Sequence, residues 1–283
     1  MKINIPQLYF SKLMRAIVEF EMIEDGDHIL IGVSGGKDSI FLAYALAILR
    51  QRLHKDFRVS ALTINPMFKD ETTGLPAPFD TERIKQFMQS LDIPYDTVDV
   101  DIAGAIEEQA GKSPCFTCAY FRRGAMNHYA VEHGMNKIAY AHHNDDAVET
   151  FLMSLLYSGQ LNTFTPKTYL DRTGLTVIRP LIYFREMPNI YVFKPLNFKS
   201  KKEIIEAIPY HGFQPVPSPC PHDGNTIRQT VKELIVQLEK TTPDLYDHLA
   251  SGMRQGALGE LWPAARTRDE MRDTYFRYLG RKN

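Results

Sequence analysis

The feature of this chain that most restricts its fold is a glycine-rich loop between a strand pattern and a helix pattern. The loop reads Ser34-Gly35-Gly36-Lys37-Asp38-Ser39. Before it, residues 28–33 are mostly apolar and follow turn residues, which is typical of a strand buried on both faces. After it, residues 37–53 are predicted to form a helix. A buried strand that turns sharply into a helix is a unit of a parallel sheet with helices on both faces.

Strand and helix patterns then alternate along most of the chain. Short apolar runs bounded by turn residues predict further strands at residues 59–64, 95–100 and 137–141. Helical spacing of apolar residues predicts helices at residues 8–24, 81–91, 102–109, 117–134 and 145–157. The alternation predicts an α/β fold with a doubly wound parallel sheet, for which 283 residues suffice as one large domain.

The pattern changes after Gly159. Two strands are predicted at residues 176–184 and 190–196, and two helices at residues 200–208 and 225–239. We therefore expect three parts: an N-terminal helix in residues 1–26, a main domain in residues 27–240 and a C-terminal helical extension in residues 241–283.

The composition is that of an ordinary globular protein, with 44% apolar and 24% charged residues. The net charge of −1 gives no overall basic signal, so an RNA partner would have to bind a local patch. The longest apolar stretch, residues 40–49, is too short to span a bilayer, and the first residues carry no export signal. We expect a cytoplasmic protein with no membrane partner.

The position of the glycine-rich loop indicates a phosphate site. In a doubly wound sheet the loop after the first strand lies at the carboxyl edge, where ligands bind, and its free N–H groups favour an anion. The loop is not a Walker A motif, because Ile31 and Asp38 occupy the places that this motif reserves for Gly and for Ser or Thr. An aspartate among phosphate-binding amides is costly unless a divalent cation bridges it to the phosphates, so Asp38 implies Mg²⁺.

A second polar cluster, His142-His143-Asn144-Asp145-Asp146, follows the predicted strand at residues 137–141 and begins a helix. Its carboxylates would face the same sheet edge as the glycine-rich loop, where they could hold Mg²⁺ or orient a ligand. Taken alone, such a cluster is more often a helix cap with surface charge. Its pairing with the loop favours the ligand-binding interpretation.

Three cysteines form a third signal. Cys115 and Cys118 make a C-x-x-C motif and Cys220 lies far downstream. A reducing cytoplasm disfavours disulfides, so the residues alone leave several possibilities open. Cys115 and Cys118 could be a redox or persulfide-carrying pair with Cys220 as partner, or part of a zinc site completed by a histidine such as His222. The three thiols could also be inert, or ligands of an iron–sulfur cluster.

The motifs resemble those of one known superfamily. The glycine-rich loop resembles the PP-loop of the ATP pyrophosphatases, which cleave ATP between the α- and β-phosphates and adenylate a substrate oxygen. Residues 142–146 resemble the His-His-x-Asp-Asp segment of that superfamily. Cys115 to Gly124 resembles the Cys-x-x-Cys-x-x-x-Arg-Arg-Gly segment of the tRNA 2-thiocytidine synthetases. Cys220, Asn225 and Arg228-Gln229 match a further pattern of that family, and the similarity extends over residues 13–238.

The resemblance implies an ATP-dependent tRNA sulfur transferase that adenylates a pyrimidine C2 oxygen and replaces it with sulfur. ATP would bind at Ser34, Gly35, Gly36, Lys37, Asp38, Ser39, Ile64, His142 and His143. The catalytic residues would be Lys37, Asp38, Asp145 and Asp146, with Asp38 on Mg²⁺. A 4Fe–4S cluster would be held by Cys115, Cys118 and Cys220, leaving one iron open. The tRNA would be bound by Arg122, Arg123 and Arg228.

The resemblance also implies a homodimer and a partner that supplies sulfide, such as a cysteine desulfurase. The chain departs from the family pattern in two places, and the insertion, together with the C-terminal extension, bears on the substrate. Pro217 stands where the family often has another cysteine before Cys220, and extra residues predict a hairpin insertion at about residues 182–198. Two other functions therefore stay open: a PP-loop ligase or sulfur transferase acting on another nucleoside or a small molecule, and a nucleotide-binding regulatory protein.

Overall fold

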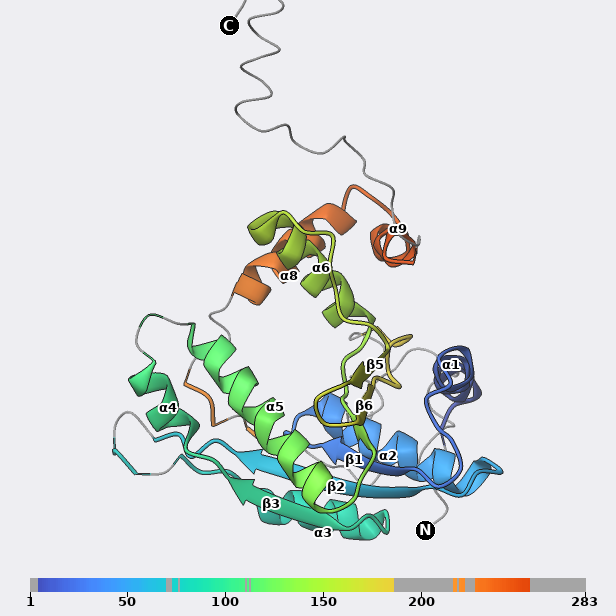
Figure 1. Ribbon diagram of the computed structural model, residues 1–283. Helices are drawn as coiled ribbons and strands as arrows, with labels where there is room; N and C mark the ends of the chain where they lie inside the picture. Colours follow the sequence, from blue (N-terminus) through green and yellow to red (C-terminus); the bar gives the residue numbers. More distant parts are fainter. Residues whose placement is uncertain are drawn as a thin grey trace, which may run out of the picture. The chain divides into compact units, whose positions relative to one another are not determined.

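The computed structural model describes residues 5–69, 73–75, 77–109, 111, 113–185, 216–217, 219–221 and 227–254. The chain divides into two compact units, Met1–Tyr246 and Asp247–Asn283. The second unit is described only from residue 247 to 254, which includes most of helix α9 (Leu245–Gly252). The first unit contains the sheet and the candidate site, and the following description concerns it (Figure 1).

A six-stranded sheet forms the centre of this unit, with the strand order β3-β2-β1-β4-β6-β5. The strands are β1 (His28–Gly32), β2 (Arg58–Asn65), β3 (Tyr95–Asp99), β4 (Lys137–Ala139), β5 (Lys167–Leu170) and β6 (Leu175–Ile178). All neighbouring strands are parallel except β5 and β6. The predicted α/β fold with a doubly wound sheet is thus confirmed, with one antiparallel strand added at the edge.

The end of the sheet corrects two sequence-based expectations. The strand predicted at residues 176–184 ends at Ile178, because Pro180 has no N–H to continue the ladder and the chain turns there. Its hairpin partner is β5, which the sequence pattern did not predict because its residues are partly exposed rather than an apolar run. The predicted strand at 190–196, the helix at 200–208 and residues 186–198 of the predicted insertion lie outside the described residues.

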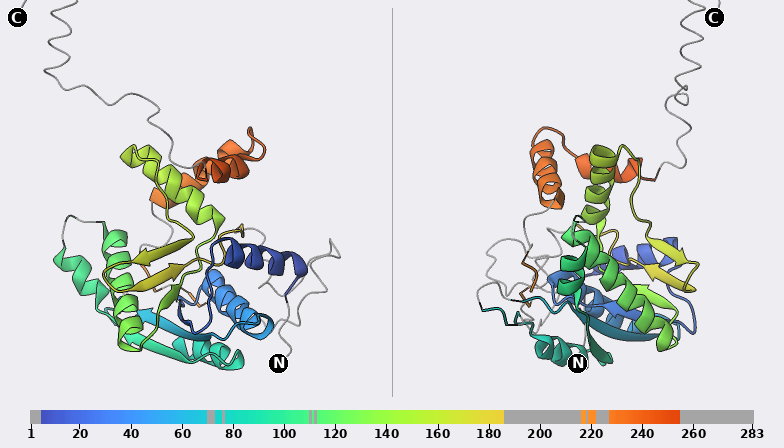
Figure 2. Two further views of the ribbon diagram at one scale, coloured as in Figure 1. Left: turned by 45° about the vertical axis from the view of Figure 1, so that its right-hand side comes forward. Right: turned by 60° about the vertical axis from the view of Figure 1, so that its left-hand side comes forward.

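Helices cover both faces of the sheet (Figures 1 and 2). In chain order the helices of this unit are α1 (Gln7–Glu19), α2 (Lys37–Arg52), α3 (Thr81–Ser90), α4 (Ile102–Glu108), α5 (Pro114–Glu132), α6 (Asn144–Ser158) and α8 (Ile227–Glu239), of which α6 and α8 pack on each other away from the sheet faces. Helix α2 packs on β1 and β2, whereas α5 packs on β2, β4 and β6 from the other face. Every residue from Ser39 to Leu49 in α2 is buried, as expected of a helix enclosed by the core on all sides.

The N-terminal helix α1 shares this core. Tyr9 contacts Phe41 of α2 and Phe184 edge-to-face, with ring centroids 6.2 and 5.6 Å apart, and Phe41 lies 5.3 Å from Phe184.

None of the described helices is both long enough and apolar enough to cross a membrane.

The topology places two loops beside each other. Strands β1 and β4 are parallel neighbours, but the chain leaves β1 toward β2 and leaves β4 toward β6. The loops that follow them, residues 33–36 and 140–143, therefore meet at the carboxyl edge of the sheet at a topological switch point, where α/β proteins bind ligands.

Candidate functional site

The glycine-rich loop has a conformation that only glycine tolerates at its centre. Gly35 has a φ of +78°, and a Cβ there would lie 3.0 Å from the Val216 Cβ and 3.1 Å from the Ile84 Cδ1. The Gly35 carbonyl accepts a 3.0 Å hydrogen bond from the Val216 N–H. This bond joins the loop to the segment of residues 216–221, which carries Cys220.

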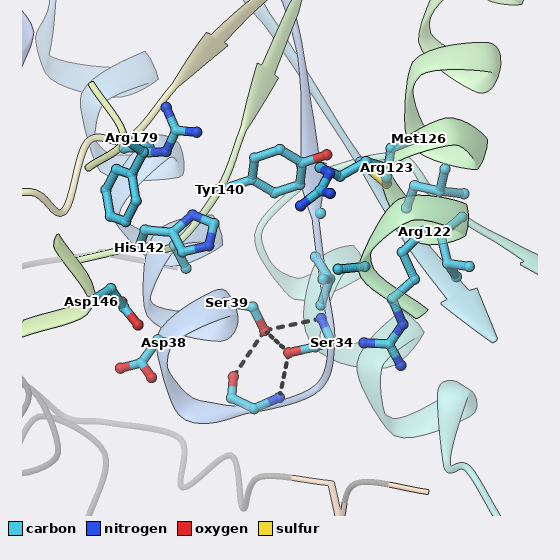
Figure 3. Close-up of a pocket in the computed structure, with 18 of the residues that line it drawn as sticks. Ser34, Asp38, Ser39, Arg122, Arg123, Met126, Tyr140, His142, Asp146 and Arg179 are labelled. Carbon is cyan, nitrogen blue, oxygen red and sulfur yellow. Dashed lines mark hydrogen bonds between the residues drawn. The ribbon is translucent and has the colours of Figure 1, made fainter. Parts of the chain in front are cut away.

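Two serines hold the ends of the loop together. The Ser39 hydroxyl donates to the Gly36 carbonyl at 2.9 Å, and the Ser34 N–H donates to the Ser39 Oγ at 3.2 Å (Figure 3). Gly36 then caps the N-terminus of α2, where the helix dipole and unpaired N–H groups favour an anion. The local arrangement therefore suits a phosphate group.

A cavity of about 760 Å³ opens above this loop (Figure 3). Its lining comes mainly from the glycine-rich loop and α2, the β2 strand, helix α5, and the loop and helix after β4. The segment of residues 216–219, the residues before β5 and after β6, and helix α8 complete it. The lining includes Ser34, Gly36, Asp38, Ser39, Ile64, Ala119, Arg122, Arg123, Tyr140, His142, Asp146, Phe164, Arg179, Val216, Pro219 and Arg228.

The phosphate end of the cavity carries two carboxylates. Asp38 and Asp146 come from the first turns of α2 and α6, and Figure 3 shows both at the same end of the cavity. Lys37 Nζ lies 2.9 Å from an Asp38 oxygen. Carboxylates on two helix N-termini beside a phosphate-binding loop are the ligands that Mg²⁺ prefers when it bridges to phosphates.

His143 lies between these carboxylates. Its Nε2 is 4.0 Å from Asp38, and its Nδ1 is 3.4 Å from Asp145 and 3.5 Å from Asp146. Burial lowers the pKa of His143, but the three carboxylates outweigh burial and raise it overall. The imidazolium is therefore stabilised here, but the ring does not line the cavity.

Asp145 points away from the cavity. Its carboxylate is buried and accepts a 3.1 Å hydrogen bond from Arg185 Nε. Successive residues of a helix face different directions, and of the two carboxylates in the first turn of α6 Asp146 lines the cavity whereas Asp145 does not. The catalytic role that the sequence assigned to Asp145 stays a prediction, and the geometry favours Asp146 for the metal.

The cavity also has an aromatic wall. The His142 ring lies 5.1 Å from Phe164 and 5.8 Å from Tyr140, centroid to centroid. Burial lowers the pKa of His142 to about 4, so the ring is neutral near pH 7. A neutral imidazole among aromatic rings is suited to a planar, uncharged base.

The cysteines lie next to the cavity. Helix α5 begins at Pro114, not near residue 117 as predicted, because proline is favoured in the first turn of a helix. Cys115 is therefore in the first turn and Cys118 begins the second; Cys115 is exposed and Cys118 half-buried. Cys118 and Cys220 pack against the same hydrophobic cluster, and their chain neighbours Ala119 and Pro219 line the cavity.

The three thiols are near enough to influence one another electrostatically. Burial raises the pKa of the Cys118 thiol, the Arg122 guanidinium partly opposes this, and the nearby Cys220 and Cys115 raise the pKa further. Within the described residues, however, no three His, Cys, Asp or Glu side chains are arranged to hold a metal ion. The fold thus brings the segments that bear the thiols together without assembling a ligand set. His222, the histidine named above as a possible zinc ligand, lies outside the described residues.

Comparison with known proteins gives the family. The PP-loop domain family matches residues 9–204. The tRNA-cytidine(32) 2-sulfurtransferase of Ralstonia pickettii (strain 12J) is 32% identical over 247 residues, which cover 86% of this chain and 71% of the relative. The enzyme of the same name from Syntrophotalea carbinolica is 34% identical over 253 residues, covering 88% and 87%. This chain belongs to the PP-loop tRNA-cytidine(32) 2-sulfurtransferases.

A solved structure supports the fold of this family member. The U34-tRNA thiolase NcsA from Methanococcus maripaludis, solved with its 4Fe–4S cluster, has a TM-score of 0.62 and 20% sequence identity. The match covers 97% of this chain and 89% of NcsA. The family likeness identifies the chain as an enzyme of the sulfurtransferase class and the glycine-rich loop as a PP-loop.

The arginines predicted to bind tRNA behave differently from one another in this sulfurtransferase. Arg122 and Arg123 line the cavity and form no ion pair with any described residue. Arg228 also lines it, but donates to Asp146 at 2.9 Å and to Glu149 at 3.3 Å. As placed, Arg228 ties α8 to α6, and its contact with tRNA stays a prediction.

Three further residues of the sulfurtransferase site were missed by the sequence patterns. Tyr140 and Phe164 line the cavity as described, and Arg179 lines it from the end of β6. The Arg179 guanidinium lies 4.7 Å from the Phe164 ring centroid and donates to the Thr165 carbonyl at 2.6 Å. For Tyr140 and Arg179 the available signal was their position after β4 and β6, because side chains at the carboxyl ends of parallel strands reach the ligand site, whereas Phe164, between α6 and β5, carried no such signal.

Proposed function

We propose that this chain is an ATP-dependent tRNA sulfurtransferase that converts a cytidine in tRNA to 2-thiocytidine. The observation that carries the proposal is the single cavity that joins the PP-loop, Asp146 and the two segments that bear Cys118 and Cys220. The hydrogen bond between Gly35 and Val216 joins the first and last of these directly. Activation and sulfur insertion can then act on one base.

The first step is adenylation. The N-terminus of α2 and Lys37 stabilise the negative charge of the ATP phosphates, and Asp38 with Asp146 would hold the Mg²⁺. The cytosine O2 attacks the α-phosphorus, the bond from that phosphorus to the bridging oxygen breaks, and pyrophosphate leaves. The neutral His142 and the Phe164 ring form the apolar surface against which the base lies.

The second step is sulfur insertion. The sulfur of a hydrosulfide bonds to C2, the C2–O bond breaks, and AMP leaves with the oxygen. Sulfide enters and oxygen leaves in the same oxidation state, so the reaction needs no net oxidant or reductant. A 4Fe–4S cluster held by Cys115, Cys118 and Cys220 would supply the hydrosulfide on its open iron.

The donor set suits such a cluster in its chemistry. Soft thiolates are the preferred ligands of iron–sulfur clusters, and three of them leave one iron without a protein ligand. The basic side chain of Arg122 offsets the negative charge that thiolates bring to this side of α5. Because Cys115 is exposed, closing the set requires the first turn of α5 to turn this side chain toward Cys118 and Cys220.

We extend the proposal to the context of the reaction. A catalytic domain in residues 27–240, with flanking parts in residues 1–26 and 241–283, would act in the cytoplasm on tRNA. A cysteine desulfurase or another sulfide donor would supply sulfur, and the active form would be a homodimer. These assignments rest on the family resemblance.

The test is thionucleoside profiling of tRNA from cells with and without the gene, complemented by variants. We expect 2-thiocytidine to disappear in the deletion strain and to return with the wild-type chain. Cys220→Ala should release pyrophosphate from ATP in the presence of tRNA but form no 2-thiocytidine, and should lose iron from a wild-type content of about four per chain. Asp38→Asn should lose both half-reactions.

Each alternative predicts a different result. Unchanged 2-thiocytidine in the deletion strain would refute thiolation of tRNA cytidine and favour another nucleoside or a small molecule as substrate. Full 2-thiocytidine formation by an iron-free Cys220→Ala variant would refute the role of the cluster.

A further inference from the structure

A second cavity, of about 530 Å³, lies between α5 and the β5–β6 hairpin. It is lined by Val100, Tyr120, Phe121, Arg123, Gly124, Ala125, Asn127, Tyr140, Thr168, Leu170, Val177 and Arg179. Three of these residues, Arg123, Tyr140 and Arg179, also line the first cavity. They form a wall shared by the two cavities, and no function described above uses the second cavity.

The shared wall carries hydrogen-bond donors that lack acceptors. The Tyr140 hydroxyl and the Arg179 Nε are buried and have no hydrogen-bond partner among the described residues. Burial raises the pKa of Tyr140 to about 12, so this hydroxyl remains a donor at every physiological pH. Buried donors are rarely left unpaired, because an unmade hydrogen bond costs free energy.

The charge on the shared wall is also uncompensated. Arg123 and Arg179 form no ion pair with a carboxylate of the described residues. Figure 3 shows the Tyr140 side chain pointing across the cavity toward the Arg123 guanidinium. A group that satisfies two guanidinium groups and a hydroxyl together is an anion with several acceptor oxygens, of which a phosphate is the chemical type that an RNA substrate brings.

The remainder of the second cavity suits a nucleobase. Tyr120 is 61% exposed and its ring lies edge-on to Phe121, with centroids 5.6 Å apart. Val100, Leu170 and Val177 add an apolar surface behind them. Single-stranded RNA is bound by this combination of aromatic faces for the bases and arginines for the backbone.

We propose that the second cavity binds the RNA nucleotide that adjoins the target cytidine. The phosphodiester between the two nucleotides lies on the shared wall, held by Arg123, Tyr140 and Arg179. The adjoining base stacks on Tyr120. This inference rests on the proposed function, because the target cytidine must occupy the first cavity.

Gly124 allows a direct test. It lines the second cavity but not the first, it lies within α5, and a Cβ added there meets no atom within 4 Å. Gly124→Leu therefore extends an apolar side chain into the second cavity from a position with room for its Cβ, and leucine is a better helix former than glycine. The matched control is His128→Leu on the same helix, since that exposed side chain lines neither cavity.

The measurement compares the affinities of the full-length chain for cytidine monophosphate and for dinucleotides with cytidine in the first or second position. For the wild type we expect one dinucleotide to bind roughly tenfold tighter than the mononucleotide, because an additional base stacks on an aromatic side chain. Gly124→Leu should abolish this gain and leave the affinity for cytidine monophosphate and ATP unchanged. His128→Leu should retain the gain.

Two results would overturn the inference: no tighter binding of either dinucleotide by the wild type, or an undiminished gain in Gly124→Leu. Both are independent of the proposed function, which is tested by 2-thiocytidine formation in tRNA. If the chain thiolates tRNA but gives either of these results, the proposed function stands and the nucleotide site in the second cavity is refuted.

Discussion

The arginines around the site fall into two groups that differ in what neutralises them. Arg122, Arg123 and Arg179, from α5 and the end of β6, have no carboxylate partner among the described residues. Arg185 and Arg228, on the α6 and α8 side, are paired with Asp145, Glu239, Asp146 and Glu149. We call the first set the open arginines and the second the paired arginines.

The difference separates two uses of the same side chain. A paired arginine has its charge compensated within the protein, so removing it leaves a carboxylate without a partner and costs stability. An open arginine has its charge available to an anionic ligand, so removing it should cost affinity. The comparison therefore predicts that replacing a paired arginine lowers stability, whereas replacing an open arginine lowers the affinity for RNA.

The largest effect is expected from a paired arginine. Arg228→Ala should lower the free energy of unfolding by about 3 kcal/mol, because it removes the nearest cation from Asp146 and from the 1% exposed Glu149 and leaves them only His143 and the more distant Lys232. Urea unfolding would measure this, with Arg172→Ala on an exposed turn as control. If both variants unfold at the same urea concentration, the pairing contributes nothing to stability.

The carboxylate in this pairing gives the next effect. Burial raises the pKa of Glu149 to about 7, although Lys232 and Arg228 oppose the shift. A carboxyl group whose pKa is raised on folding stabilises the folded state below its unfolded pKa and loses that contribution as the pH rises through the folded pKa. Stability should therefore fall by on the order of 2 kcal/mol between pH 4.5 and about 7.

Glu149→Gln isolates this contribution, because it removes the titration and keeps the shape. The difference in unfolding free energy between the wild type and Glu149→Gln should change across this pH range, as followed by urea unfolding at several pH values. Parallel curves would show that Glu149 titrates normally. The exposed Glu132→Gln is the control.

An open arginine should behave in the opposite way. Arg123→Ala should weaken binding of a stem–loop RNA roughly tenfold and lower the slope of log Kd against log salt by about one. Its free energy of unfolding, measured in urea, should stay within about 0.5 kcal/mol of the wild type. Arg123→Lys should retain most of the salt slope. A destabilised Arg123→Ala with normal RNA affinity would reverse the assignment of the two groups.

The smallest effect concerns the shared wall itself. Tyr140→Phe removes a buried hydroxyl without a partner and should raise the free energy of unfolding by about 1 kcal/mol, while RNA binds more weakly. Thermal unfolding with and without RNA would measure both changes. A less stable Tyr140→Phe would mean that the hydroxyl already has a partner in the free protein.

Local patterns predicted the fold well. The strands and helices from β1 through α6 lie within a few residues of their predicted positions, because each has either an apolar run or helical spacing. The edge strand β5 was missed, since its half-exposed residues carry no such run. The PP-loop was predictable for a similar reason: its chemistry is contained in six consecutive residues.

Long-range pairing was not predictable. Arg228 reads as an RNA contact in the sequence, yet its partners Asp146 and Glu149 lie 82 and 79 residues away. Nothing local distinguishes it from Arg123. Likewise, Asp145 and Asp146 look equivalent as letters, but the first turn of α6 points only Asp146 into the cavity. These outcomes depend on which helices meet, which a linear pattern does not contain.

The contact between Gly35 and Val216 has a consequence for engineering this protein. A side chain introduced at Gly35 would collide with Val216 and so disturb the strip of chain that leads to Cys220 as well as the nucleotide loop. A single substitution at this glycine should therefore impair ATP use and sulfur handling together.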